Sequence, residues 1–351
     1  MSTPFVYDVV LRCLHKINGE RTVFSIYHLL CGKKSSQTIQ DAHLFQLAPF
    51  FNTYNAITRQ EFVTIIEELK ASELIEHKQE DVYQLTQSGI FYVEDEKAKH
   101  PFLKYLDGYR FQTAELFWAR LSLLVQVASH LIRNESRFIP IQSNRHVQSW
   151  LKIFIQRGQF QREKLGHSLY QELSTCLEGM TDLDPAIFVI RLTGHERIGL
   201  TEMQAASVLK LESTLYHYQF LALLHEMMNR LLEGKSSYPL LYSMISDLHN
   251  EALLTDSTKK TYQLLSKGYS IEEIGKIRKL KVNTIQDHVV ELALQLTDFD
   301  ITPYVKEEKI VRIIEAKDKT GSKQLRHMKE IVPEASYFEI RLVMSRYGEE
   351  K

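Results

Sequence analysis

Polar side chains suited to binding a nucleic acid gather between residues 276 and 286. The first group is basic and suited to contacting phosphates: Lys276, Arg278, Lys279 and Lys281. The second group carries amide or hydroxyl groups, which can hydrogen-bond to base edges: Asn283, Thr284 and Gln286. We expect the basic group to position phosphates and the second group to lie in a groove.

A pair of short helices must hold these side chains, and the stretch GYSIEEIGKIRKLKVNTIQDHVVELAL, residues 268–294, predicts such a pair. Gly268 ends the preceding helix, and Ser270 is a candidate N-cap for the next one. Each helix has an expected buried stripe: Ile271, Ile274 and Ile277 on the first, and Val282, Ile285, Val289 and Leu292 on the second. This is a helix-turn-helix pattern, in which the second helix enters the groove.

The charge pattern is mixed in this region. The expected open face of the second helix also carries Asp287 and Glu291, which would repel phosphate. The whole chain is nearly neutral, with a formal net charge of -1 over 351 residues. Residues 257–347 hold 17 Lys and Arg against 13 Asp and Glu, so this segment is +4 and the remainder is -5. The C-terminal third is therefore the expected nucleic-acid face.

Apolar residues recur at helical spacing through most of the chain, which contains only 14 Gly and 8 Pro, and this predicts a mainly α fold. The exception is residues 74–92, where two short apolar segments flank the polar residues 77–81, as in a β-hairpin. Together with the helical pattern ahead of it, this hairpin predicts an N-terminal winged helix. The charged run 94–101, EDEKAKHP, is an expected linker.

A second helix-turn-helix-like pattern occupies residues 199–233, with Thr201 as its candidate cap. Its outward helix begins ESTLYHYQF and carries no lysine, so we expect a structural or protein-binding role. The expected domains follow from these boundaries: a winged-helix domain at 1–95, a helical middle domain at 101–250, and a C-terminal helix-turn-helix domain at 256–347.

Motifs for catalysis and metal binding are incomplete. The segment CGKKSS, residues 31–36, has Tyr27 where a phosphate-binding loop needs glycine. His225 and Glu226 are not followed by a second histidine at the zinc-protease spacing. Asp184, which precedes Pro185, is typical of a turn or cap. We expect a protein that is not an enzyme and has no cofactor and no metal site.

The cellular compartment is predicted from cysteines and hydropathy. The three cysteines, Cys13, Cys31 and Cys176, lie far apart in apolar helical patterns, as expected of buried thiols in a reducing cytoplasm. No apolar run approaches the ~20 residues of a membrane span. We expect a cytoplasmic protein, with nucleoid association as an option, and no membrane partner.

Two parts of the chain resemble known families. NGERTVFSIYHLLCGKKSSQTIQDAHLFQLAPFF, followed by LIEHKQEDVYQLTQSG, resembles the N-terminal part of the YpbB family of low-GC Gram-positive bacteria and, more distantly, the winged-helix domain at the C-terminus of RecQ helicases. The segment beginning TYQLLSKGYSIEEIGK, with VPEASYFEIRLVMSRY after it, resembles the helix-turn-helix module that ends YpbB proteins and some RecQ and Werner-type helicases. The resemblance to YpbB spans essentially the whole chain, although the RecQ four-cysteine zinc module is absent.

This resemblance implies a protein without helicase motor domains, of a family typically encoded beside a RecQ-type helicase. The leading hypothesis is a non-enzymatic DNA-binding accessory protein with low sequence specificity, acting with a RecQ-like helicase in recombination or repair. One alternative is a sequence-specific helix-turn-helix transcription regulator. Another is a protein-interaction scaffold without DNA affinity.

Overall fold

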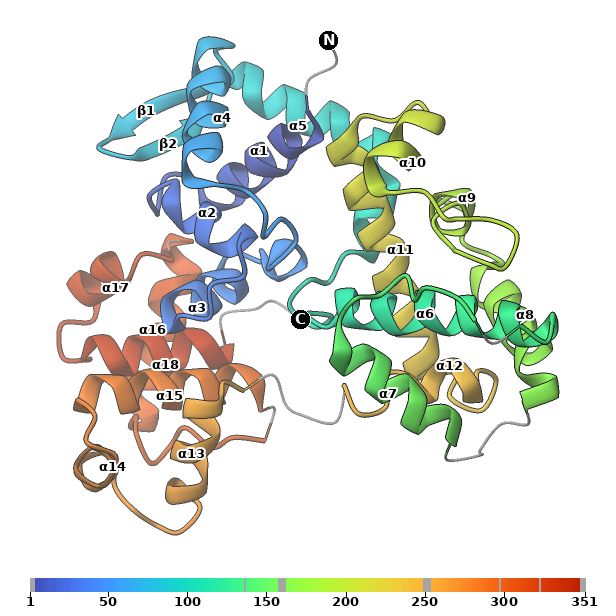
Figure 1. The fold of residues 1–351 in the computed structure, drawn as a ribbon. Helices are drawn as coiled ribbons and strands as arrows, with labels where there is room; N and C mark the ends of the chain where they lie inside the picture. Colours follow the sequence, from blue (N-terminus) through green and yellow to red (C-terminus); the bar gives the residue numbers. More distant parts are fainter. Residues whose placement is uncertain are drawn as a thin grey trace. The chain divides into compact units, whose positions relative to one another are not determined.

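The computed structural model (Figure 1) describes residues 4–135, 137–156, 162–248, 254–296, 298–321 and 323–347, without the side chains at 97, 98, 162 and 163. Its secondary structure is helical except for one two-stranded hairpin in the described residues. The predicted fold class, mainly α with a short β-hairpin and a C-terminal helix-turn-helix, is confirmed. No helix in those ranges is both long and apolar enough to cross a membrane.

The chain forms two compact units that do not follow sequence order. Unit 1 comprises Met1–Val9 and Glu94–Asn250, and unit 2 comprises Val10–Val93 and Glu251–Lys351. The N-terminal and C-terminal segments, which we expected as separate domains, thus belong to the same unit. Whether residues 1–95 and 256–347 fold independently stays a prediction.

Unit 1 is built from helices, which follow one another along the chain as η2 (Pro101–Tyr105), α6 (Ala114–Ile132), α7 (Arg145–Gln156), α8 (Arg162–Leu177), α9 (Ala186–Val189), α10 (Glu202–Val208), α11 (Ser213–Glu233) and α12 (Pro239–Ser243). Aromatic side chains fill its core, where Trp118 of α6 meets Phe188 and Phe220 edge to face with ring centroids 5.3 and 5.0 Å apart. The Tyr216 hydroxyl donates to the Ile187 carbonyl at 2.6 Å, so the polar end of this buried ring is satisfied.

Unit 2 combines the two ends of the chain. Its N-terminal elements are α1 (Phe5–Ile17, which begins in unit 1), α2 (Phe24–Leu30), α3 (Ser36–Leu44), η1 (Ala48–Phe50), α4 (Arg59–Ala71), β1 (Ile75–Gln79), β2 (Val82–Leu85) and α5 (Gln87–Lys99, which ends in unit 1). Its C-terminal elements are α13 (Asp256–Leu265), α14 (Ile271–Arg278), α15 (Val282–Gln295), α16 (Glu307–Thr320), α17 (Leu325–Ile331) and α18 (Tyr337–Tyr347). Helix α3 packs on both α15 and α18, as Figure 1 shows.

The expected hairpin is present, but its tip is shorter than predicted. Strands β1 and β2 are antiparallel, and residues 77–79 belong to β1, which leaves Glu80 and Asp81 as the turn. Asp81 has a φ of 55°, a left-handed conformation that Asp tolerates better than most residues. Its carbonyl accepts a hydrogen bond from the Val23 N–H at 2.8 Å, so the turn is held against the start of α2.

The sequence predicts a linker and domain boundary at residues 94–101: the two units do divide between Val93 and Glu94, but the segment is not a loop, because α5 continues through Lys99. The charged residues pair within the helix: Lys99 Nζ lies 2.6 Å from Asp95 and 2.8 Å from Glu96. A charged run with these spacings supports a helix as well as a loop. Pro101 then begins η2, where its missing N–H is not needed.

A buried histidine in unit 1 predicts a pH-dependent stability. His225 is 1% exposed, and its Nδ1 accepts a hydrogen bond from the Asp107 N–H at 3.0 Å. Burial lowers the pKa of His225 from 6.5 to about 3. The unfolded chain therefore binds a proton at a pH where the folded chain does not, so stability is complete above pH 6.5 and falls as the pH drops toward the folded pKa.

We expect His225 to remove about 2 kcal/mol of unfolding free energy between pH 7.5 and 5. In His225→Asn, which keeps an acceptor but cannot bind the proton, this pH dependence should flatten. Urea unfolding followed by tryptophan fluorescence measures it, since both tryptophans, Trp118 and Trp150, lie in unit 1. His146→Asn, at an exposed position, is the control. An unchanged pH slope in His225→Asn would contradict the assignment.

Candidate nucleic-acid interface

The predicted helix-turn-helix consists of α14 and α15, and α13 precedes it. Helix α14 begins where predicted, because Ser270 and Glu273 form a capping box: the Glu273 N–H donates to Ser270 Oγ at 3.2 Å, and the Ser270 N–H donates to Glu273 Oε2 at 2.8 Å. Gly268, with a φ of 87°, separates α14 from α13. Both expected sequence signals for the start of this motif are confirmed.

The buried stripe of α14 differs from the expected one. Ile271 and Ile274 are buried, but Ile277 is 52% exposed and Gly275 is buried instead. Each three-residue step along a helix falls about 60° short of a full turn, so successive steps of this kind leave the buried face. A Cβ at position 275 would lie 3.2 Å from the Leu280 carbonyl oxygen, which is tight for any residue but glycine.

Three of the four expected phosphate contacts lie on the surface around the turn. Lys276, Lys279 and Lys281 are exposed, at the last turn of α14, its C-cap and the N-cap position of α15. Lys279 has a φ of 53°, a left-handed conformation unusual for lysine, and it reverses the chain between the two helices. The turn thus holds basic groups next to the positive N-terminal end of α15.

Arg278, the fourth expected contact, is occupied within the domain. Its Nη1 donates to the Ser257 carbonyl at 2.7 Å and to the Thr261 hydroxyl, and its Nη2 donates to Ser257 Oγ at 3.0 Å. Partial burial lowers the pKa of Arg278. The structure places this guanidinium between α14 and α13, where it joins the two helices and is not directed to an external phosphate.

The expected groove contacts occupy the first turns of α15. Asn283 is exposed, whereas Thr284 and Gln286 are half-buried. From His288 to Ala293 every residue is buried, because α3, α13, α14 and α18 all pack against this helix. The exposed residues of α15, Val282 and Asn283, therefore lie at its N-terminal end.

The expectation that Glu291 lies on the open face is wrong, since it is 3% exposed. Its carboxylate accepts hydrogen bonds from the Thr255 N–H at 2.5 Å and from the Thr258 hydroxyl at 2.6 Å. A helical pattern identifies the most apolar face of a helix, but it does not reveal that a helix is surrounded by neighbours. Glu291 joins α15 to the start of α13 and does not repel phosphate.

Asp287 also forms an ion pair within unit 2. Its Oδ1 lies 2.6 Å from Nη1 of Arg341 on α18, and Nε of the same arginine donates to Gln40 on α3 at 2.9 Å. This interaction largely neutralises the negative charge beside the groove contacts. No sequence signal identified Arg341, because it lies 54 residues after Asp287.

A polar cleft of about 1080 Å³ lies beside this ion pair, between N-terminal and C-terminal segments of unit 2; its lining includes Arg21, Gln40, Asp41, Asp287, Arg326 and Arg341. The two least exposed arginines in it are each paired with a carboxylate, Arg21 with Asp41 at 3.0 Å and Arg341 with Asp287. Burial raises the pKa of Asp41 despite its neighbouring Arg21. The cleft lining carries four basic residues, Arg21, Lys33, Arg326 and Arg341, against three acidic ones, Glu20, Asp41 and Asp287, so its positive excess is smaller than that of the three exposed lysines of the turn.

The middle helix-turn-helix pattern forms α10 and α11 in unit 1. Thr201 caps α10 in a capping box with Gln204, as expected. Several outward polar groups are used internally: Glu212 caps α11 and accepts a hydrogen bond from the Phe5 N–H at 3.0 Å, and His217 lies 3.0 Å from Glu202. The hydrogen bond from His217 lowers the pKa of Glu202. These contacts favour a structural role for this second pattern.

Comparison with known proteins supports the C-terminal assignment. A family model described as a helix-turn-helix domain matches residues 257–344, which span α13 to α18. The chain is 35% identical to Protein YpbB of Bacillus subtilis (strain 168) over 349 residues, covering 99% of this chain and 98% of that protein. No solved structure matches the chain significantly.

Glu291→Ala should destabilise unit 2 by about 1–3 kcal/mol, because it leaves the half-buried Thr255 N–H and the buried Thr258 hydroxyl without their acceptor. Urea unfolding followed by circular dichroism measures the change. Glu272→Ala, which removes an exposed carboxylate from α14, should shift stability by no more than about 0.5 kcal/mol. Equal effects of the two substitutions would contradict the buried role of Glu291.

Proposed function

The chain belongs to the YpbB family, and on this premise we propose that it is a non-enzymatic DNA-binding accessory protein that acts with a RecQ-like helicase in recombination or repair. The helix-turn-helix domain suggests DNA binding. The observation that carries the proposal is the cluster of Lys276, Lys279 and Lys281 around the exposed first turn of α15. In this arrangement lysines contact phosphates on either side of the helix end that enters the groove.

The small accessible surface of α15 favours low sequence specificity. Asn283, Thr284 and Gln286 are the groups at its N-terminal end that can reach base edges, and two of them are half-buried. Each good bidentate contact discriminates by about 1–3 kcal/mol, so a protein with so few contacts depends mainly on phosphates. This favours an accessory DNA-binding role over that of a regulator that reads a defined site.

Support for a helicase partner comes from the sequence resemblance. The hairpin segment and the C-terminal module resemble domains that RecQ-type helicases carry beside their motors, and CGKKSS lacks the glycine of a phosphate-binding loop. The structure adds that Gly32 follows the end of helix α2, with a φ of 66°. In this proposal the partner helicase supplies the motor domains that hydrolyse ATP, and this chain supplies the accessory domains.

The DNA-binding part is tested by charge reversal. Lys279→Glu/Lys281→Glu should weaken binding to labelled duplex and forked DNA and lower the salt slope by about 2, since two phosphate contacts are lost. Fluorescence anisotropy at several salt concentrations measures both quantities. Lys70→Glu/Lys164→Glu, at two exposed lysines outside the turn, matches the charge change and serves as the control.

Unchanged binding by a folded Lys279→Glu/Lys281→Glu variant would remove the turn from the DNA interface. No binding by the unaltered chain at low salt would favour the protein-interaction scaffold. Protection of one duplex sequence only would favour the transcription regulator.

The helicase part is tested separately by unwinding of a forked substrate. Addition of the chain to the RecQ-like helicase of the same organism should increase the unwinding rate, and the Lys279→Glu/Lys281→Glu variant should not. The control variant should stimulate like the unaltered chain. Equal unwinding with and without the chain, together with no co-purification of the two proteins, would reject the partnership while leaving DNA binding intact.

A further inference from the structure

The end of helix α6 places a histidine beside a glutamate. Asn134 has a φ of 55°, its N–H donates to the Leu131 carbonyl at 3.0 Å, and the Glu135 N–H donates to the His130 carbonyl at 3.0 Å. These two hydrogen bonds define a Schellman ending, in which the residue after the left-handed one lies against the third residue from the helix end. That contact is usually apolar, but in this helix it joins His130 and Glu135.

A loop distant in sequence adds a second histidine. The His195 N–H donates to Ser129 Oγ on α6 at 2.9 Å, and Arg133 forms an ion pair with Glu196 at 2.7 Å. A Cβ on Gly194 would lie only 3.1 Å from Ser129 Oγ, so a glycine lets this backbone approach the helix. The loop is thus held with the His195 ring at the end of α6.

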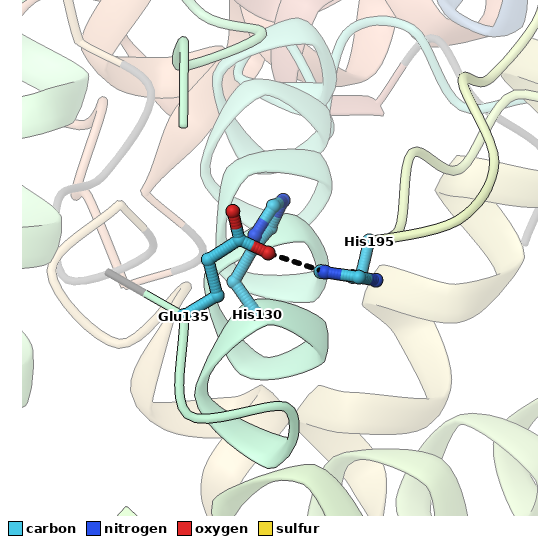
Figure 2. A group of neighbouring side chains, drawn as sticks. All are labelled: His130, Glu135 and His195. Carbon is cyan, nitrogen blue, oxygen red and sulfur yellow. Dashed lines mark hydrogen bonds and ion pairs between the residues drawn. The ribbon is translucent and has the colours of Figure 1, made fainter. Parts of the chain in front are cut away.

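The three side chains converge, as Figure 2 shows. One ring nitrogen of each histidine and one carboxylate oxygen of Glu135 lie within 4.8 Å of one another. His195 Nε2 is 2.5 Å from Glu135 Oε2, and the His130 ring stacks on Phe138 with centroids 4.3 Å apart. His130 is 8% exposed, and its Nδ1 is buried without a hydrogen-bond partner in the described ranges. A buried ring nitrogen without a partner is costly unless something binds it.

We propose that His130, Glu135 and His195 are the ligands of a divalent transition metal, which we expect to be Zn²⁺. Two histidines and one glutamate form a set used by zinc at sites with three protein ligands and an open fourth position. Imidazole nitrogen favours zinc over Mg²⁺ and Ca²⁺, which prefer oxygen. Ligand atoms around tetrahedral zinc lie about 3.3 Å apart, so a set within 4.8 Å reaches that geometry by small side-chain rotations.

The surroundings of the site fit a metal that joins the loop to the helix. Glu135 is exposed, so solvent can fill the fourth position, whereas His130 is held by its stacking on Phe138. Zn²⁺ would replace the hydrogen bond between Glu135 and His195. Histidine and glutamate bind a metal only when deprotonated, so binding weakens as the pH falls. It also stabilises unit 1, because the metal joins the end of α6 to residues 193–197.

The experiment uses the full-length chain without a histidine tag, treated with a chelator and dialysed. Calorimetric titration with ZnCl₂ should show one site per chain, and MgCl₂ should show none. Thermal unfolding followed by tryptophan fluorescence should shift upward with Zn²⁺. Substitution by Co²⁺ should give the visible absorption of a tetrahedral site containing nitrogen ligands.

Two variants identify the ligands. His195→Ala and Glu135→Gln should each bind Zn²⁺ at least about tenfold more weakly and lose the cobalt spectrum. Glu135 is exposed, so its substitution leaves the core of the unit intact. His146→Ala, which removes an exposed histidine elsewhere in unit 1, should bind like the unaltered chain. Absence of zinc binding by the unaltered chain, or unchanged affinity in Glu135→Gln and His195→Ala, would overturn the proposal and leave an ordinary Glu135–His195 ion pair.

Discussion

Helix α15 is enclosed by α3, α13, α14 and α18, and this enclosure governs what unit 2 can present to a partner. A helix packed against four neighbours must satisfy every polar group that it carries inward. Glu291 does so with Thr255 and Thr258 at the start of α13, and the half-buried Asp287 pairs with Arg341 of α18. The same contacts that bury the body of the helix leave its first turn as the accessible end.

This constraint explains why the candidate DNA surface is small and basic. The turn before α15 carries exposed lysines, and the helix N-terminus adds its own positive potential. The negative groups expected nearby are buried or paired, so they do not cancel this potential. A surface of this kind suits contact with the nucleic-acid backbone more than extensive readout of base edges.

The N-terminal segment contributes to the same unit by supporting the helix-turn-helix. Gln40 of α3 accepts a hydrogen bond from Arg341, and Gln295 of α15 lies 3.1 Å from His43 of α3. These contacts join residues 252 or more positions apart. Unit 1 carries the candidate metal cluster, which depends in the same way on a distant loop brought to the end of α6.

The sequence by itself determined the local structure: the mainly α fold, the hairpin, the caps at Thr201 and Ser270, and the exposed Lys276, Lys279 and Lys281. Such features depend on residues within about one helical turn, where spacing and capping chemistry act directly. Only the tertiary structure decided that Arg278 and Glu291 face inward, that Arg341 pairs with Asp287, and that His130, Glu135 and His195 converge. Those outcomes depend on which distant elements pack together, and the amphipathic pattern of one helix contains no information about its neighbours.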